Sequence, residues 1–171
     1  MISLGLFLLI KNQEQDENEK SSFKAEKLFQ AGQYTEAINI YRQMSNISAS
    51  NLLVYGKALA LNGEHRKAVA ILERAKKQLS EPFLCNNLGI SYQALKEYKR
   101  AEENFKLSHQ MIPNLIYPKY LLAKLYIEEG KVSKARKQAI EVINSPIKVY
   151  SEAAEEMKEE LRIYLSQNTG K

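Results

Sequence analysis

The chain repeats a short pattern at nearly constant intervals, and this period constrains its fold more than any other feature. At four places a turn residue, glycine or lysine, is followed five residues later by an alanine. The alanines are Ala37, Ala68, Ala101 and Ala135, which lie 31, 33 and 34 residues apart. A period of this length is typical of stacked supersecondary units that share one continuous core. The sequence therefore predicts a repeat protein.

Each copy has the apolar spacing of two successive helices. In the third copy Leu88 and Tyr92 precede the turn at Lys96, and Ala101 and Phe105 follow it. Four-residue steps place these side chains on one face of each helix. The unit is therefore predicted to be a helix hairpin.

Small residues mark where the helices cross and where they end. Gly89 and Ala101 are expected at the helix crossing, because ridges of one helix enter the grooves of another most closely at small side chains. A turn glycine suits the left-handed residue that ends many helices. Lys96 takes that place in the third copy, so a tighter or strained turn is expected there. The turn glycines of the other copies are Gly32, Gly63 and Gly130.

These residues resemble the tetratricopeptide repeat (TPR), and the match covers about residues 18–147. The small residues, the turn and the following aromatic or apolar residue recur in register, and Pro113 closes the third copy. The resemblance implies an all-α fold, namely a right-handed superhelix of about four helix hairpins with a concave groove and a C-terminal capping helix.

By composition the chain divides into four parts: an apolar segment at 1–10, a polar linker at 11–20, four repeats at 21–147 and a capping helix at 148–166. An apolar stripe with glutamates opposite predicts the capping helix, because a repeat array needs an end helix with a polar outer face. A chain of 171 residues that is 44% hydrophobic has room for one linear core and no second globular domain.

The apolar segment at 1–10 has three interpretations. Ten residues of helix span about 15 Å, whereas the hydrocarbon core of a membrane is about 30 Å thick, so this segment cannot cross a membrane alone. It lacks the basic leading region and the cleavage site of a secretory signal. It is a shallow anchor, a helix packed on the core or on a partner, or the end of a longer transmembrane helix that begins outside this chain. We favour the third interpretation, which implies membrane attachment through residues 1–10.

The formal net charge is +5, and the positive residues are distributed along the chain, mostly on the second helix of each repeat and hence on the convex side. A solvated helix face accounts for this distribution, since an array carries charge where it meets water. Nucleic-acid binding is disfavoured, because it would require clustered charge and interleaved aromatic residues. Attraction to an anionic membrane surface gains weight from the apolar N-terminal segment.

The sequence contains no group of residues whose types and spacing indicate a catalytic site. His65 and His109 belong to different repeats and lack neighbouring cysteines at metal-ligand spacing. Cys85 is interpreted as a small buried hydrophobic residue. The glycines are isolated and form no phosphate-binding loop. The sequence therefore predicts no enzyme, no catalytic residue, no metal and no cofactor.

The first helix of each TPR hairpin lines the concave side, so the resemblance implies a partner-binding groove there. Its mixture of aromatic anchors and amide donors suits a bound protein segment or peptide. Packing between neighbouring first helices accounts for the same aromatics equally well. Chaperone-binding TPR proteins hold the terminal carboxylate of their partner with a set of lysine, asparagine and arginine side chains on these helix faces. In this chain only Asn87 clearly matches that set, so chaperone binding is disfavoured. The predicted groove residues are Leu53, Lys57, Phe83, Asn86, Asn87, Ile90, Gln93, Tyr117, Tyr120 and Lys124.

A second, narrower resemblance covers both the apolar segment at 1–10 and the repeats. Four segments are similar to the C-terminal TPR tail of bacterial O-antigen ligase and polymerase-like membrane proteins: residues 51–59, 80–82, 111–122 and 146–157. This implies the soluble tail of a membrane glycoconjugate-assembly protein, with the cytoplasmic side favoured, and no catalytic residue carries over. The alternatives are a free-standing cytoplasmic TPR adaptor and a nucleic-acid binder that uses its basic convex face.

Overall fold

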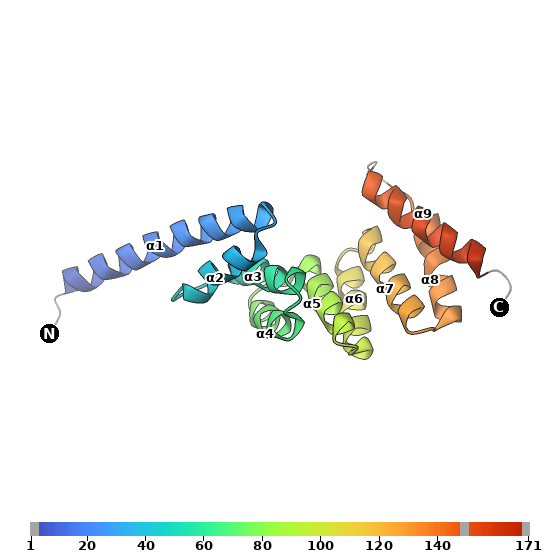
Figure 1. Cartoon of the computed structure of the whole chain (residues 1–171), viewed down its shortest axis with the longest axis horizontal. Helices are drawn as coiled ribbons and strands as arrows, with labels where there is room; N and C mark the ends of the chain where they lie inside the picture. The colour runs from blue at the N-terminus through green and yellow to red at the C-terminus, as the bar shows by residue number, and fades with distance from the viewer. Residues whose placement is uncertain (1–3, 148–150, 169–171) are drawn as a thin grey trace. The chain divides into compact units, whose positions relative to one another are not determined.

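The computed structural model describes residues 4–147 and 151–168, and over these residues the chain forms helices and no strand (Figure 1). The predicted all-α class is confirmed. The predicted apolar segment and capping helix fall partly outside the described residues, at 1–3 and 148–150. The helices are α1 (Leu4–Gln30), α2 (Tyr34–Gln43), α3 (Ala49–Leu61), α4 (His65–Lys76), α5 (Pro82–Ala94), α6 (Tyr98–Met111), α7 (Ile116–Glu128), α8 (Val132–Asn144) and α9 (Glu152–Gln167).

The chain divides into two compact units, Met1–Ser80 and Glu81–Lys171, here called unit 1 and unit 2. Unit 1 contains the hairpins α1–α2 and α3–α4, which pack together through α2 and α3. Unit 2 contains the hairpins α5–α6 and α7–α8, and α9 packs on α8 and α7. The four predicted hairpins and a C-terminal helix are therefore present.

The same hydrogen-bonded turn closes the first helix of each hairpin. In the second hairpin the Gly63 N–H donates to the Ala60 carbonyl at 3.0 Å, and the Glu64 N–H donates to the Leu59 carbonyl at 2.8 Å. Equivalent pairs of bonds close the other three turns. This arrangement satisfies the last carbonyls of the helix and requires a residue in the left-handed region.

Lys96 takes this left-handed position without being a glycine. Its φ is 61°, and among the residues that the structure describes it is the one non-glycine residue with positive φ. A side chain in this region costs about 1–2 kcal/mol relative to the right-handed conformation. The strain expected at this turn therefore lies at Lys96.

Glycine and alanine let the two helices of a hairpin approach closely. All four repeat alanines are fully buried, which confirms the register of the repeat. A Cβ atom added at Gly56 would overlap the side chain of Leu72, and one added at Gly89 would overlap the ring of Phe105. In these two hairpins a large side chain from the second helix therefore fills the space that the glycine leaves.

α1 is longer than its hairpin requires. It runs without a break through residues 11–20, the predicted polar linker, and the predicted boundaries after residues 10 and 20 lie inside it. No helix in the described part of the chain combines the length and the apolar character needed to cross a membrane.

Replacing Gly89 by alanine should destabilise the chain. The added methyl group overlaps the buried Phe105 ring, so we expect a loss of about 1–3 kcal/mol. Thermal unfolding followed by circular dichroism measures it. Ala94→Leu, which adds a larger group at an exposed position of the same helix, is the control. Equal melting temperatures for the two variants would contradict the close crossing of α5 and α6.

Exchanging the turn residues of the second and third hairpins should have opposite effects. Lys96→Gly should stabilise the chain by about 1 kcal/mol, because glycine adopts positive φ without steric cost. Gly63→Lys should destabilise it by about the same amount. Chemical denaturation of both variants measures the pair, and a destabilising Lys96→Gly would show that the turn is not strained.

Candidate functional site

In unit 2 the first helices of the two hairpins, α5 and α7, and the C-terminal helix α9 form one continuous face. α5 contacts α7, and α7 contacts α9, so these three helices lie side by side. We call this surface the α5–α7–α9 face. The residues that define it are Phe83, Asn87, Gln93, Tyr117, Tyr120, Lys124, Glu128, Glu152, Glu156 and Glu160.

Polar contacts join α5 to α7 across this face. The Gln93 side-chain amide donates a hydrogen bond to Glu128 near the end of α7. The hydroxyl of Tyr98, at the start of α6, donates to the same carboxylate at 3.2 Å. Glu128 is itself exposed. One carboxylate therefore fixes the hairpin α5–α6 against the next hairpin.

A second carboxylate joins α7 to α9. The Tyr120 hydroxyl and the Lys124 ammonium, one turn apart on α7, both donate to Glu160 of α9. Burial raises the pKa of Tyr120, and the hydrogen bond to Glu160 raises it further. Burial alone would raise the pKa of Glu160, but the bonds from Lys124 and Tyr120 lower it below the ordinary value of 4.5. Glu160 is therefore held as a carboxylate at neutral pH.

Apolar packing and a lysine hold α9 from its other side. Leu161 is fully buried in a core cluster with Ala123, Ala139 and Val142. The Lys158 ammonium donates to the Ser145 carbonyl at 2.7 Å, just beyond the end of α8. A cation at this position satisfies a helix-terminal carbonyl and suits the negative end of the helix dipole. α9 is thereby fixed to the last hairpin.

The predicted groove residues on α5 differ in their exposure. Phe83 is 54% exposed, and the neighbouring Asn87 donates its side-chain amide to the Phe83 carbonyl at 2.7 Å. Ile90 and Gln93 are partly buried. Asn86 is only 1% exposed, and neither polar atom of its amide has a hydrogen-bond partner among the described residues. Asn86 therefore does not present its amide to solvent.

The remaining predicted residues lie on α7 and on α3. Tyr117 and Tyr120 are partly buried, and burial raises the pKa of Tyr117. Leu53 and Lys57 belong to unit 1, where the Lys57 ammonium lies 5.3 Å from the centre of the Phe29 ring. The structure thus brings together the members on α5 and α7, whereas the two members on α3 belong to the other unit.

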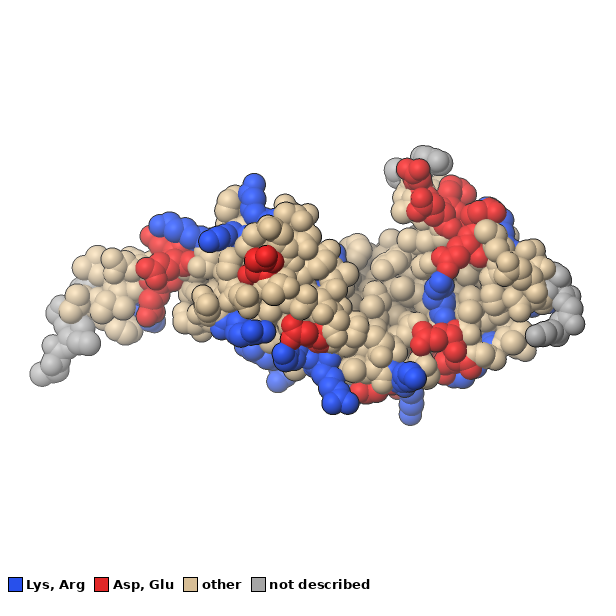
Figure 2. Space-filling model, in the orientation of Figure 1, with Lys and Arg blue, Asp and Glu red and all other residues tan. Residues whose placement is uncertain are grey.

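Sequence reasoning assigned the glutamates of α9 to a polar outer face and did not count them among the groove residues. Glu152, Glu156 and Glu160 recur at four-residue steps on α9, and all three are exposed. Residues four apart are neighbours on a helix surface, so these glutamates form one stripe. That spacing is visible in the sequence and was the available signal. Figure 2 shows acidic side chains gathered over α9.

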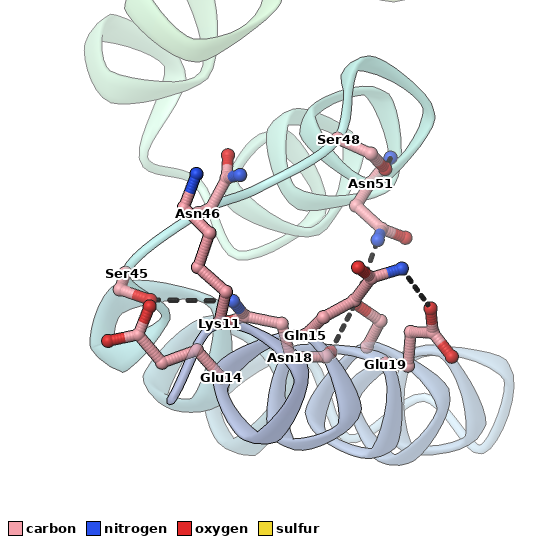
Figure 3. Close-up of a pocket in the computed structure, with 10 residues that line it drawn as sticks. Lys11, Glu14, Gln15, Asn18, Glu19, Ser45, Asn46, Ser48 and Asn51 are labelled. Atoms are coloured by element: carbon pink, nitrogen blue, oxygen red, sulfur yellow. Dashed lines mark hydrogen bonds between the residues drawn. The ribbon is translucent and has the colours of Figure 1, made fainter. Parts of the chain in front are cut away.

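A polar pocket of about 590 Å³ lies in unit 1, between α1 and the chain that leads into α3 (Figure 3). The Asn51 side chain donates to Ser22 at 2.8 Å, and Asn18 donates to Ser45 at 3.4 Å. These bonds run from one wall of the pocket to the other. They hold α1 to the remainder of unit 1, so we assign the lining a structural role.

The histidines do not form a metal centre in the described residues, where no group of three histidine, cysteine, aspartate or glutamate side chains could hold an ion. Burial lowers the pKa of His109, and the nearby Lys119 lowers it further. Cys85 is buried, as its apolar sequence context predicts.

Comparison with known proteins gives the fold. No family model matches the chain. MamA from Desulfovibrio magneticus RS-1, residues 41 to the end, superposes with a TM-score of 0.69 at 15% identity, over 89% of this chain and 93% of that structure. A putative kinesin light chain from Podosopora anserina with nearly identical TPR-like repeats gives 0.66 at 18% identity, over 88% of each chain. The chain therefore has a TPR-like fold.

One relative among curated proteins is the BBSome complex member BBS4 of Mus musculus, which is 27% identical over 109 residues. A second is BBS4 of Xenopus tropicalis, 25% identical over 108 residues. Each match covers 61% of this chain but only 21% of the relative, so the chain spans about a fifth of the length of these proteins.

Glu160 makes the attachment of α9 sensitive to acid. Because its pKa is lower in the folded than in the unfolded chain, Glu160 stabilises the fold above about pH 4.5, and this contribution is lost as the pH falls through the folded-state pKa. Glu160 is 46% exposed, so the contribution is about 1 kcal/mol or less.

Glu160→Gln should therefore melt earlier than the native chain at neutral pH, and the difference in melting temperature should be smaller at about pH 3. Thermal unfolding at both pH values measures this difference. Glu156→Gln, at an exposed position one turn earlier on α9, is the control. If the melting temperature of Glu160→Gln stays equally far below that of the native chain at low pH, the loss of the carboxylate is not the cause of the destabilisation.

Proposed function

We propose that this chain is a protein-interaction module and that its α5–α7–α9 face holds an extended segment of a partner rich in lysine and arginine. The observation that carries the proposal is the acidic stripe of α9, whose member Glu160 accepts hydrogen bonds from Tyr120 and Lys124 of α7. The module acts by binding, and we assign it no catalytic role.

The charges of the face favour a basic partner. Lys124 is paired with Glu160, so one cation on the face is already neutralised. Gln93 and Tyr98 donate hydrogen bonds to Glu128 from uncharged groups, which leave its negative charge in place. Glu152 and Glu156 extend the negative charge along α9. A cationic segment would gain charge-assisted hydrogen bonds from these carboxylates.

The aromatic residues supply the apolar part of the same interface. Phe83 exposes more than half of its side chain, and Tyr117 and Tyr120 are partly exposed. Arginine and lysine side chains stack favourably on such rings, and aromatic residues commonly anchor bound segments. Acidic and aromatic groups on one face therefore complement an extended basic segment better than an acidic or wholly apolar one.

The relatives are consistent with an interaction role. BBS4 is by its name a member of a complex, and 109 residues of this chain are similar to part of it. The narrower interpretation, a tail of an O-antigen ligase or polymerase, rests on its four similar sequence segments alone. It stays a prediction, with the free-standing adaptor as its alternative. Nucleic-acid binding through the convex basic residues is the less favoured alternative.

Peptide binding tests the proposal. A fluorescein-labelled dodecapeptide of lysine, arginine and tyrosine should bind the full chain, and its counterpart with glutamate in place of every lysine and arginine should not. Glu152→Lys combined with Glu156→Lys should weaken binding about tenfold, because each exposed charge contributes up to about 1 kcal/mol. Fluorescence anisotropy at two salt concentrations measures both peptides.

Glu17→Lys combined with Glu19→Lys is the matched control, because it changes the net charge equally on exposed positions of α1 in unit 1. The control should bind the basic peptide nearly as well as the native chain. An equal loss in both double variants would show that overall charge, and not this face, determines binding. Preference for the acidic peptide would place the working surface on the convex basic residues instead.

A further inference from the structure

The start of α1 exposes a dense group of large apolar side chains. Between Leu4 and Ile10 six of them have exposed fractions of 41–75%. The six residues are Leu4, Leu6, Phe7, Leu8, Leu9 and Ile10. Exposed apolar groups concentrated in one place mark an interaction site, whereas single ones are normal.

These side chains point in every direction around the helix. Successive residues of an α-helix are rotated by about 100°, so five consecutive apolar residues from Leu6 to Ile10 cover the whole circumference. A helix that docks in a protein groove has an apolar stripe on one side and polar residues opposite. A helix that is apolar all round suits surroundings that are apolar on all sides, and lipid provides these.

A second copy of the chain does not match this pattern. Pairing of two α1 helices would require apolar residues to continue every three or four positions for about three heptads or more. The next positions of such a seam are Lys11, Glu14, Gln15 and Asn18, which are polar. In Figure 3 these four side chains lie at the polar pocket of unit 1.

The polar end of the segment has the features expected of a helix at the surface of a membrane. Lys11 follows Ile10 directly, and its ammonium lies 4.9 Å from the centre of the Phe7 ring. Long basic side chains of this kind lie along apolar surface and keep the charged group in water. The helix from residue 4 to residue 10 is about 10 Å long, which matches the depth to which interfacial segments enter a bilayer.

We propose that residues 4–10 of α1 insert into the boundary between headgroups and acyl chains of a lipid bilayer. The driving force is apolar, because the next turns carry the exposed acids Glu14, Asp16, Glu17 and Glu19, which disfavour an anionic surface. Binding to zwitterionic lipid is therefore expected, with little dependence on salt. This inference is independent of the α5–α7–α9 face.

A single tryptophan reports the insertion, because the native chain contains none. Phe7→Trp in the full chain should show blue-shifted emission on addition of phosphatidylcholine vesicles and quenching by brominated acyl chains. Phe23→Trp is the matched control, since Phe23 is 64% exposed on the same helix but lies beyond the apolar segment. Its emission should not change.

Vesicle flotation then measures the affinity. Leu6→Glu combined with Leu9→Glu should reduce the bound fraction at least about tenfold, since burial of each leucine is lost. Phe23→Glu should leave the bound fraction unchanged. An unshifted Phe7→Trp spectrum would overturn the proposal. A blue shift that grows with protein concentration in the absence of lipid would also overturn it, because it would indicate pairing with a second copy of the chain. Binding to anionic vesicles alone, abolished by salt, would overturn it as well, because it would indicate that the convex basic residues bind the membrane.

Discussion

The close approach of the two helices within a hairpin is the constraint on which the rest of the structure depends. Gly56 leaves room for Leu72, and Gly89 leaves room for Phe105. With the backbones this close, the second helix covers one side of the first and leaves the opposite side available to neighbouring hairpins or partners. In unit 2, α5 and α7 use that side for their mutual contacts and for the aromatic residues of the proposed binding face.

Local sequence signals predict the hairpins well, because each signal acts over a few residues. Ala101 is fully buried, as the repeat register requires, and Lys96 takes the strained left-handed turn. The continuity of α1 follows a different rule. Polar composition favours a linker over residues 11–20, but glutamate, glutamine and lysine are good helix formers, and nothing in the segment breaks a helix. Helix propensity prevails there, and the charged residues stay exposed.

The candidate face was predicted only in part, because its contacts join residues from separate repeats. The burial of Asn86 and the pairing of Glu160 with Tyr120 and Lys124 depend on how successive helices are rotated against each other. No short sequence pattern specifies that rotation. The repeat period likewise gives no sign that the chain divides into two compact units after Ser80.

Amide hydrogen exchange of the full chain, with and without the basic dodecapeptide, tests most directly whether the first helices of unit 2 form the working surface. Slower exchange on peptide addition is expected in α5, α7 and α9, with α6 and α8 unchanged. Backbone amides respond to binding wherever it occurs, so the measurement does not presuppose the face. Protection confined to the second helices, or protection in unit 1 alone, would contradict the assignment of function to this face.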